Sequence, residues 1–356
     1  MLAFLAILPL SLSLAALILP RIPSTYWLMR IFDYPRPQLM VIHLLSIVLL
    51  ALAFGGQWWV WGIAGLLLTD IVWQGVRILP FTSLTAKEVL DIRDGEQPGA
   101  RLSLLHWNVF QENRAHKSLL GQVEEMQPDM IFLCETDQAW VDELAPLRKQ
   151  YPHYLEVPLD NTYGLCFYSR YPLQDAEICY LIADDVPSLK AQVLLPEGEK
   201  IQLYGVHPIP PMPKYGKTTI PRDAELLKVA RQIEKADDSL PHLLFGDLND
   251  VAWSSNTRLF QKISRLLDPR RGRGIIPTFN AQYPIFGIPI DQLFCSTHFK
   301  LVKMDRLPAM GSDHYPLYIE VAMTDHAERV QEGQIEKPDE EDYRQARDTI
   351  IAGNNY

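Results

Sequence analysis

The stretch LLFGDLND, residues 243–250, decides the fold, because an apolar run stops abruptly at Asp247. A second stretch, GSDHYPL at 311–317, places Asp313 and His314 directly before another apolar run. Apolar runs of about 4–8 residues bounded by turn residues are typical of buried strands. Because strand ends meet at the edges of a sheet, these stretches predict a polar site at one edge.

Working outward from 243–250, similar apolar runs recur on both sides. They predict strands at 102–107, 130–134, 164–168, 201–206, 242–246, 291–295 and 316–322. Amphipathic patterns between them predict helices at 115–127, 137–149 and 222–236, the last opening at Pro221. Strands mixed with helices predict an α/β or α+β layered domain.

The remaining polar candidates also stand at strand ends. Asn108 follows LLHW, Glu135 follows IFLC, His207 follows LYGV, and Asp291 begins DQLFC. Carboxylates are the ligands that hard cations such as Mg²⁺ or Mn²⁺ prefer, histidines suit acid–base work, and amides can donate to phosphoryl oxygens. Each residue alone has an ordinary structural alternative, such as a turn or a local hydrogen bond. The prediction rests on the ordered set.

The ordered set resembles the endonuclease/exonuclease/phosphatase superfamily over about residues 100–322. The matching pieces are WN at 107–108, the strand ending in Glu135, FYSRYPL at 167–173, VHP at 206–208, GDLND at 246–250, IDQLF at 290–294 and GSDHYPL at 311–317. DVAWSSNTRLF at 250–260, LLDPRRGRG at 266–274 and PTF at 277–279 further resemble a bacterial subgroup with N-terminal membrane helices.

The resemblance implies a four-layer α/β/β/α sandwich and in-line attack of water on phosphorus, assisted by Mg²⁺ or Mn²⁺. It implies Glu135 as the principal metal ligand, with Asn108 beside the metal and Asp313 in support. The catalytic set that it implies is His207, Asp247, Asn249, Asp291 and His314. Arg170 and Arg222 are candidate substrate-binding residues, although Arg170 equally fits a strand end.

The pattern departs from the family at two positions. Phe110 stands where some nucleases of the family carry an aspartate, and Gln292 stands where an aromatic or histidine often follows the aspartate. The basic cluster of Arg270, Arg271 and Arg273 fits a solvated loop better than a polyanion site. These features weaken any transfer of substrate class, not of chemistry.

The first 80 residues are overwhelmingly apolar and predict membrane helices at about 1–19, 38–54 and 57–76. A buried helical hairpin of a soluble domain is the alternative. The loop 20–37 carries Arg21, Arg30 and Arg36, whereas the turn Gly55–Gly56 carries no charge. The positive-inside rule therefore predicts a multi-pass protein with a cytoplasmic catalytic domain. The resemblance to the bacterial subgroup implies that the membrane is a bacterial inner membrane.

The domain boundaries follow from these patterns. Residues 81–100 predict a linker, 101–323 the catalytic domain, and 324–356 a charged tail that is disordered or weakly helical. The four cysteines lie in apolar runs outside any CxxC pair and predict buried thiols.

Together these features predict a membrane-anchored, divalent-metal-dependent phosphoester hydrolase, with a nuclease-like phosphodiesterase first. The alternatives are a phosphoesterase of phospholipid or inositol-phosphate type and an inactive membrane scaffold. The expected partners are a phosphoester substrate, either nucleic acid or a lipid head group, and the lipid bilayer, with no obligate protein partner. The formal net charge of −10 lacks the basic footprint of a tight nucleic-acid binder.

Overall fold

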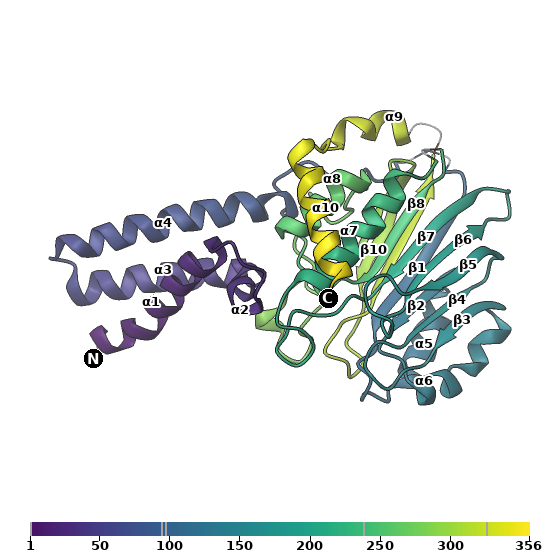
Figure 1. Cartoon of the computed structure of the whole chain (residues 1–356), viewed down its shortest axis with the longest axis horizontal. Coiled ribbons are helices and arrows are strands. Elements are labelled where there is room, and N and C mark those ends of the chain that lie inside the picture. The colour runs from purple at the N-terminus through teal and green to yellow at the C-terminus, as the bar shows by residue number, and fades with distance from the viewer. Residues whose placement is uncertain (1, 94, 97, 238, 325–326) are drawn as a thin grey trace.

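A computed structural model describes residues 2–93, 95–96, 98–237, 239–324 and 327–356. Three long helices project from one side of a larger α/β domain (Figure 1). They are α1 (Leu2–Ile18), α3 (Arg36–Phe54) and α4 (Trp58–Ile78). Each is long and apolar enough to cross a membrane. The prediction of N-terminal membrane-length helices is confirmed in these terms.

The bundle encloses one acidic side chain. Asp70 on α4 is buried and lies 2.9 Å from Nε2 of His43 on α3, and Arg21 also contacts it. An ionisable group inside a membrane needs such partners, because an unpaired charge there is costly. The polar residue that interrupts the third apolar run is therefore satisfied within the bundle.

A short connection joins α1 to α3 at the end of the bundle nearest the α/β domain. It contains η1 (Leu19–Arg21), α2 (Trp27–Arg30) and η2 (Ile31–Asp33). We call residues 22–38 the collar. At the same end, α4 passes through η3 (Leu79–Phe81) into the domain.

The α/β domain contains two sheets. The six-stranded sheet has the order β10-β11-β1-β2-β4-β3 and the five-stranded sheet the order β5-β6-β7-β8-β9. The first comprises β1 (Arg101–Asn108), β2 (Met130–Cys134), β3 (His153–Val157), β4 (Leu165–Ser169), β10 (Phe299–Arg306) and β11 (Leu317–Met323). The second comprises β5 (Leu173–Cys179), β6 (Ser188–Leu194), β7 (Lys200–Val206), β8 (His242–Asp247) and β9 (Asp291–Cys295).

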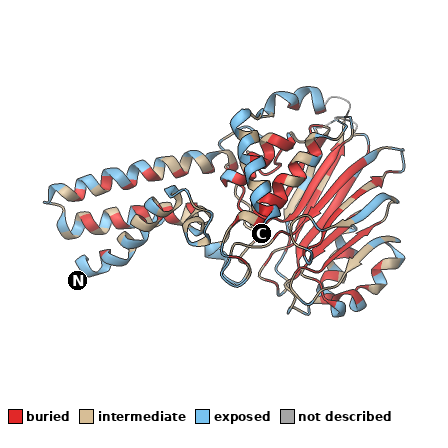
Figure 2. Ribbon diagram, in the orientation of Figure 1, coloured by how far each residue is buried: buried red, intermediate tan, exposed pale blue. Residues whose placement is uncertain are grey.

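The main core lies between the two sheets, whose central strands are buried along most of their length (Figure 2). The ring of Phe132 on β2 meets the ring of Phe245 on β8 at 5.2 Å between centroids. Gly205 on β7 permits this approach, because a Cβ there would lie 2.7 Å from Phe132. Central strands such as β2 and β8 are buried on both faces, and they therefore read as continuous apolar runs rather than alternating patterns.

Helices cover the outer face of each sheet. The helices α5 (His116–Met126) and α6 (Gln138–Glu143), followed by η4 (Ala145–Lys149), cover the six-stranded sheet. The helices α7 (Ile220–Glu234) and α8 (Ser255–Ser264) cover the five-stranded sheet. The mixed α/β fold with two sheets is thus confirmed, with its layers in the order helix, sheet, sheet, helix.

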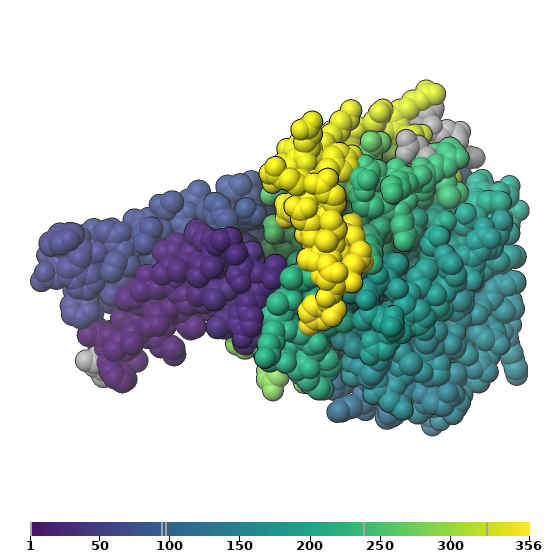
Figure 3. Space-filling model, viewed as in Figure 1, coloured from purple at the N-terminus to yellow at the C-terminus, as the bar shows by residue number. Residues whose placement is uncertain are grey.

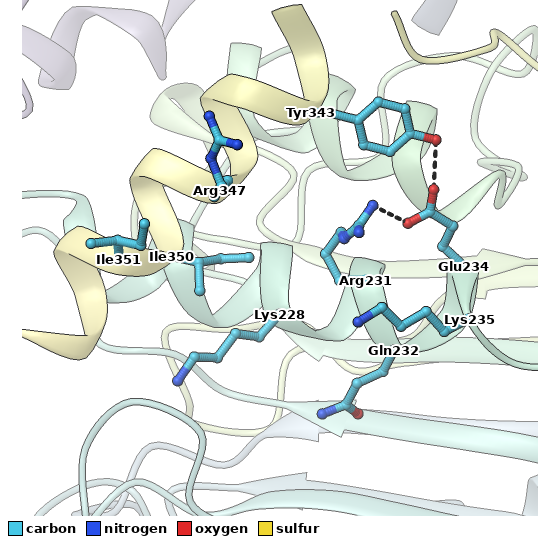
Figure 4. Close-up of a pocket in the computed structure, with 9 residues that line it drawn as sticks. All are labelled: Lys228, Arg231, Gln232, Glu234, Lys235, Tyr343, Arg347, Ile350 and Ile351. Atoms are coloured by element: carbon cyan, nitrogen blue, oxygen red, sulfur yellow. Dashed lines mark hydrogen bonds and ion pairs between the residues drawn. The ribbon is translucent and has the colours of Figure 1, made fainter. Parts of the chain in front are cut away.

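The C-terminal residues, expected to be disordered or weakly helical, are helical where the structure describes them. They form α9 (Ala327–Gln331), η6 (Glu332–Gln334) and α10 (Glu340–Asn354), and Asp339 caps α10 through a capping box. The helix α10 packs across α7, where the Tyr343 hydroxyl donates to Glu234 at 2.5 Å (Figures 3 and 4). Residues 325–326 of this stretch lie outside the described residues.

The predicted linker also packs against the domain. Val89 is fully buried, and the Leu301 amide on β10 donates to the Leu90 carbonyl at 2.8 Å. Glu88 pairs with Arg271 at 3.0 Å, which holds part of the basic cluster in a structural contact. Residues 94 and 97 of this stretch lie outside the described residues.

Candidate active site

The strand directions bring most of the predicted polar residues to one edge of both sheets. The strands β1 and β2 run parallel, as do β7 and β8, so Asn108, His207 and Asp247 all stand at carboxyl ends. The strand β9 runs antiparallel to β8 and pairs Asp291 with Asp247. The carboxyl ends of β1, β2, β7 and β8 and the first residue of β9 therefore meet at one edge of the two sheets.

Two carboxylates are held by one amide. The Nδ2 group of Asn108 donates to Oε1 of Glu135 at 2.9 Å and to Oδ2 of Asp247 at 3.0 Å. The Oδ1 atom of Asn108 accepts from the Phe110 amide at 3.0 Å, which fixes the amide plane. Glu135 has a φ of 62°, a left-handed conformation that is strained for a residue with a side chain. Asn108 thus acts as a spacer between the carboxylates of two different sheets.

Asp291 lies between two imidazoles. Its Oδ2 is 2.8 Å from Nδ1 of His314, and its Oδ1 is 3.0 Å from Nε2 of His106. Burial alone would lower the pKa of His314, but the carboxylates of Asp291 and Asp247 raise it to about 10. Burial opposes ionisation of Asp291, yet His314 and His106 hold the pKa of its carboxyl well below the usual range. Asp291 and His314 therefore form a buried ion pair at neutral pH.

His106 was missed in the sequence, where only the following Trp107-Asn108 pair was singled out. A signal was present, because His106 and Asn108 are two residues apart on β1 and so share a face. Tyr163 was also missed. Its buried ring lies 5.6 Å from the His207 ring and forms one wall of the site.

Asp247 occupies the centre. Its Oδ2 atom lies 3.7 Å from Nε2 of His207 and 3.6 Å from Nε2 of His314. Its Oδ1 atom accepts from the Asn249 amide at 2.9 Å. The Asn249 side chain points elsewhere and donates to the Pro208 carbonyl at 2.9 Å. Asn249 therefore holds the loop that follows His207 rather than contacting Asp247 through its side chain.

A family model described as the endonuclease/exonuclease/phosphatase family matches residues 105–314, more than half of the 356-residue chain. The chain belongs to this family. The suspected resemblance is thereby confirmed, and with it the class of chemistry, hydrolysis of phosphoester bonds. A comparison with curated protein sequences gives no match.

Solved structures share the endonuclease/exonuclease/phosphatase fold at low sequence identity. The human Nocturnin catalytic domain with bound sulfate is 17% identical with a TM-score of 0.53, covering 67% of this chain and 98% of that one. A Bacteroides thetaiotaomicron family member is 16% identical with a TM-score of 0.51, covering 64% and 100%. A humanized D. rerio TDP2 is 18% identical with a TM-score of 0.50, covering 63% and 99%.

The family generally uses divalent metal ions, and the donor set here fits a hard cation. Glu135 and Asp247 face each other across Asn108. Burial raises the pKa of Asp313, and although His314 opposes this, Glu135 and Asp247 raise it further, so the three carboxyl groups sense one another. Among the residues that the structure describes, no lysine or arginine forms an ion pair with any of the three. A cation would relieve this excess of negative charge.

Asp247, Asp291 and His314 also offer ligand atoms within 4.8 Å of one another. We regard this triangle as a hydrogen-bonded relay, because both oxygens of Asp291 are already bonded to imidazoles. Asn108 presents its NH₂ group to the carboxylates, so its oxygen would face a cation only if the amide turned over. Glu135, supported by Asp313, is the better donor set, and Asp247 faces it across Asn108.

The structure corrects the placement of both arginines. Arg170 follows β4 at the opposite end of the six-stranded sheet from Glu135, where it contacts Gln127 at 2.5 Å. Arg222 on α7 lies beside the site but is buried, and it pairs with Asp223 at 2.6 Å and Asp250 at 3.3 Å. Neither guanidinium is available to bind substrate as expected. Arg170 has a structural role at the end of a strand, where it also contacts Tyr151. Arg222 has a structural role in a buried ion-pair network.

Proposed function

We propose that this chain is a membrane-anchored, divalent-metal-dependent phosphodiesterase that uses in-line attack of water. The observation that carries the proposal is the Asn108 amide, which fixes Glu135 and Asp247 beside the Asp291–His314 ion pair. This arrangement places a cation-binding acid, a base and a cationic hydrogen-bond donor within one small space.

Each residue then has a separate role. Asp247 orients the attacking water and accepts its proton. His314, held cationic by Asp291, donates to a phosphoryl oxygen, and His207 protonates the leaving oxygen. Glu135, supported by Asp313, would hold Mg²⁺ or Mn²⁺, which when bound supplies charge neutralisation at the phosphoryl group. Asn108 keeps the two carboxylates apart, and Asn249 fixes the loop that carries His207.

The arginines at the end of the bundle near the domain support a cytoplasmic site. The guanidinium groups of Arg21, Arg36 and Arg77 lie 4.8, 4.9 and 4.5 Å from the Trp73 ring centroid. The opposite end, at Gly55 to Gln57, carries no charged residue. Positive charge at membrane flanks favours the cytoplasmic side. We therefore place the protein in a bacterial inner membrane with its site in the cytoplasm.

The proposal is tested with the full-length chain in detergent micelles and bis(p-nitrophenyl) phosphate, a soluble activated diester. EDTA should abolish hydrolysis, and Mg²⁺ or Mn²⁺ should restore it. Glu135→Gln should lower kcat/KM by about 100-fold or more and weaken Mn²⁺ binding measured by calorimetry. Glu124→Gln, at an exposed site on α5, is the matched control. Hydrolysis that resists EDTA, or a Glu135→Gln enzyme with unchanged rate, would overturn the proposal.

A further inference from the structure

The collar is joined to both rims of the active site. The Tyr34 hydroxyl donates to the Asn249 carbonyl at 2.7 Å, two residues from Asp247. The Trp27 amide donates to the Lys217 carbonyl at 2.9 Å, and the Thr219 amide donates to the Thr25 carbonyl at 2.8 Å. The loop 208–219, which follows His207, is therefore fastened to the segment that enters the membrane helices.

The opposite rim runs from the site to a membrane-length helix. The Phe279 ring lies 5.0 Å from the His314 ring, and the Ala281 amide donates to the Asp313 carbonyl at 2.7 Å. A few residues later, Gln38 Nε2 donates to the Ile285 carbonyl at 3.3 Å and to the Gly287 carbonyl at 3.2 Å. Gln38 belongs to the first turn of α3. The rim tip η5 (Pro284–Phe286) therefore stands beside the first turn of α3, a helix long and apolar enough to cross a membrane.

Large apolar side chains are exposed at these rim tips. Ile285 is 78% exposed, Phe286 63% and Tyr283 62%, and Met212 on the other rim is 54% exposed. In Figure 1 the light-green η5 segment lies beside α2, at the boundary between bundle and domain. Exposed apolar groups of this size mark contact surfaces, and aromatic residues favour the membrane interface. The neighbouring helix α3 is long and apolar enough to cross a membrane, which favours the bilayer as the occupant of this surface.

We propose that Tyr283, Ile285, Phe286 and Met212 sit in the head-group region of the bilayer, and that the site opens onto this surface to hydrolyse a phosphodiester of a membrane lipid. This inference rests on the proposed function and names its substrate class. A chain with a net charge of −10 disfavours a nucleic-acid substrate, whose backbone is polyanionic.

The reaction balances as a simple hydrolysis. The water oxygen bonds to phosphorus, and the bond from phosphorus to one ester oxygen breaks. Asp247 takes a proton from the water, and the leaving oxygen receives one from His207. The products are an alcohol and a phosphomonoester, one of which stays in the bilayer.

The activity test uses the full-length chain in vesicles of phosphatidylethanolamine and phosphatidylglycerol. Three substrates are compared: vesicle lipid, soluble bis(p-nitrophenyl) phosphate and plasmid DNA. The double variant Ile285→Asp, Phe286→Asp should lower lipid hydrolysis at least about tenfold and leave hydrolysis of the soluble diester unchanged, because these side chains contact bilayer rather than substrate. Val330→Asp, at a 51% exposed site on α9 away from the bundle, should change neither.

A depth measurement does not depend on activity. In a Cys179→Ser background, a nitroxide at Ile285→Cys should collide with oxygen more than with an aqueous nickel chelate, and a nitroxide at Val330→Cys should show the reverse. Equal chelate access at both positions would overturn the inference. The inference would also be overturned if the chain hydrolysed the soluble diester or DNA but neither vesicle lipid. If the wild-type chain did not hydrolyse the soluble diester at all, the proposed function itself would be overturned.

Discussion

His106 and Asp291 form a fully buried contact, with Nε2 of the imidazole 3.0 Å from Oδ1 of the carboxylate. The Nδ1 atom of His106 faces the Phe132 carbonyl at 3.2 Å, so both ring nitrogens meet oxygen acceptors. His106 touches no expected position of substrate. It holds Asp291 from behind, and Asp291 in turn orients His314.

We expect His106→Ala to lower kcat by about 10–100-fold with little change in KM, because His314 loses its fixed orientation while the substrate surface is untouched. His106→Gln keeps a donor toward Asp291 and should recover part of the loss. Steady-state kinetics on the soluble diester separate the two parameters. Equal damage from both variants, or damage seen only in KM, would contradict a positioning role.

Tyr34→Phe should reduce the free energy of unfolding by about 1–2 kcal/mol, because the hydroxyl that donates to the Asn249 carbonyl and accepts from Arg222 is lost. Arg222 keeps its own bond to that carbonyl at 2.9 Å, so the backbone oxygen stays satisfied. Limited proteolysis within 208–219 should accelerate. Tyr26→Phe, on an exposed collar residue, serves as the control, and equal proteolysis of the two variants would argue against the tie.

Glu225 gives a pH-dependent prediction. Burial on α7 raises the pKa of its carboxyl to about 7, although the Ser188 hydroxyl donates to it at 2.6 Å. Because the folded state favours the neutral carboxyl, the contribution of Glu225 to the free energy of unfolding is most favourable below pH 4.5. This contribution falls as the pH rises from 4.5 to 7. Glu225→Gln should therefore stabilise the chain at pH 8 relative to pH 4, by at most about 3 kcal/mol.

Thermal unfolding in detergent at the two pH values measures this difference. Glu197→Gln, on the exposed turn between β6 and β7, should show no such change. A Glu225→Gln effect that is the same at both pH values would rule out the buried carboxyl as its source.

Gly353→Ala should destabilise the chain by about 1–3 kcal/mol, because the new Cβ would lie 2.3 Å from the Ala224 Cβ where α10 crosses α7. Gly121→Ala is the control, since a Cβ there meets nothing within 4 Å and a helix-interior alanine is favoured over glycine. Thermal unfolding compares them. If Gly353→Ala is neutral, α10 does not pack on α7 in solution.

The sequence predicted those strands whose two faces are buried, such as β2 and β8, because they read as unbroken apolar runs. It missed β5 and β6, whose outward residues are polar or exposed and lack such runs. It missed α10 because a charged helix can still bury a narrow face, here through Ala346 and Gly353. Helix formation there depends on α7, which no local pattern reveals.

The site was predictable where a polar residue ends a strand, as for Asp247 and Glu135. It was not predictable where partners come from distant segments, as for Tyr34 and Arg222. Arg170 was placed wrongly for the same reason. It follows β4, which runs antiparallel to β2, so the end of β4 lies away from the site. To predict which end of a strand lies at the active site, one must know how the strand pairs with its neighbours. The apolar run that marks the strand does not reveal this pairing.

The contact between the collar and loop 208–219 joins two segments that are separated in the sequence by two long helices and by the first half of the α/β domain. During synthesis the collar leaves the ribosome well before its partner loop, and in the proposed membrane arrangement the helices that flank it reach the bilayer first. Loop 208–219 would then dock against a collar that those helices already hold in place. With the helices inserted as proposed, membrane insertion becomes a step in building the catalytic centre, and an excised domain starting near residue 98 would lack the collar contacts that fasten loop 208–219.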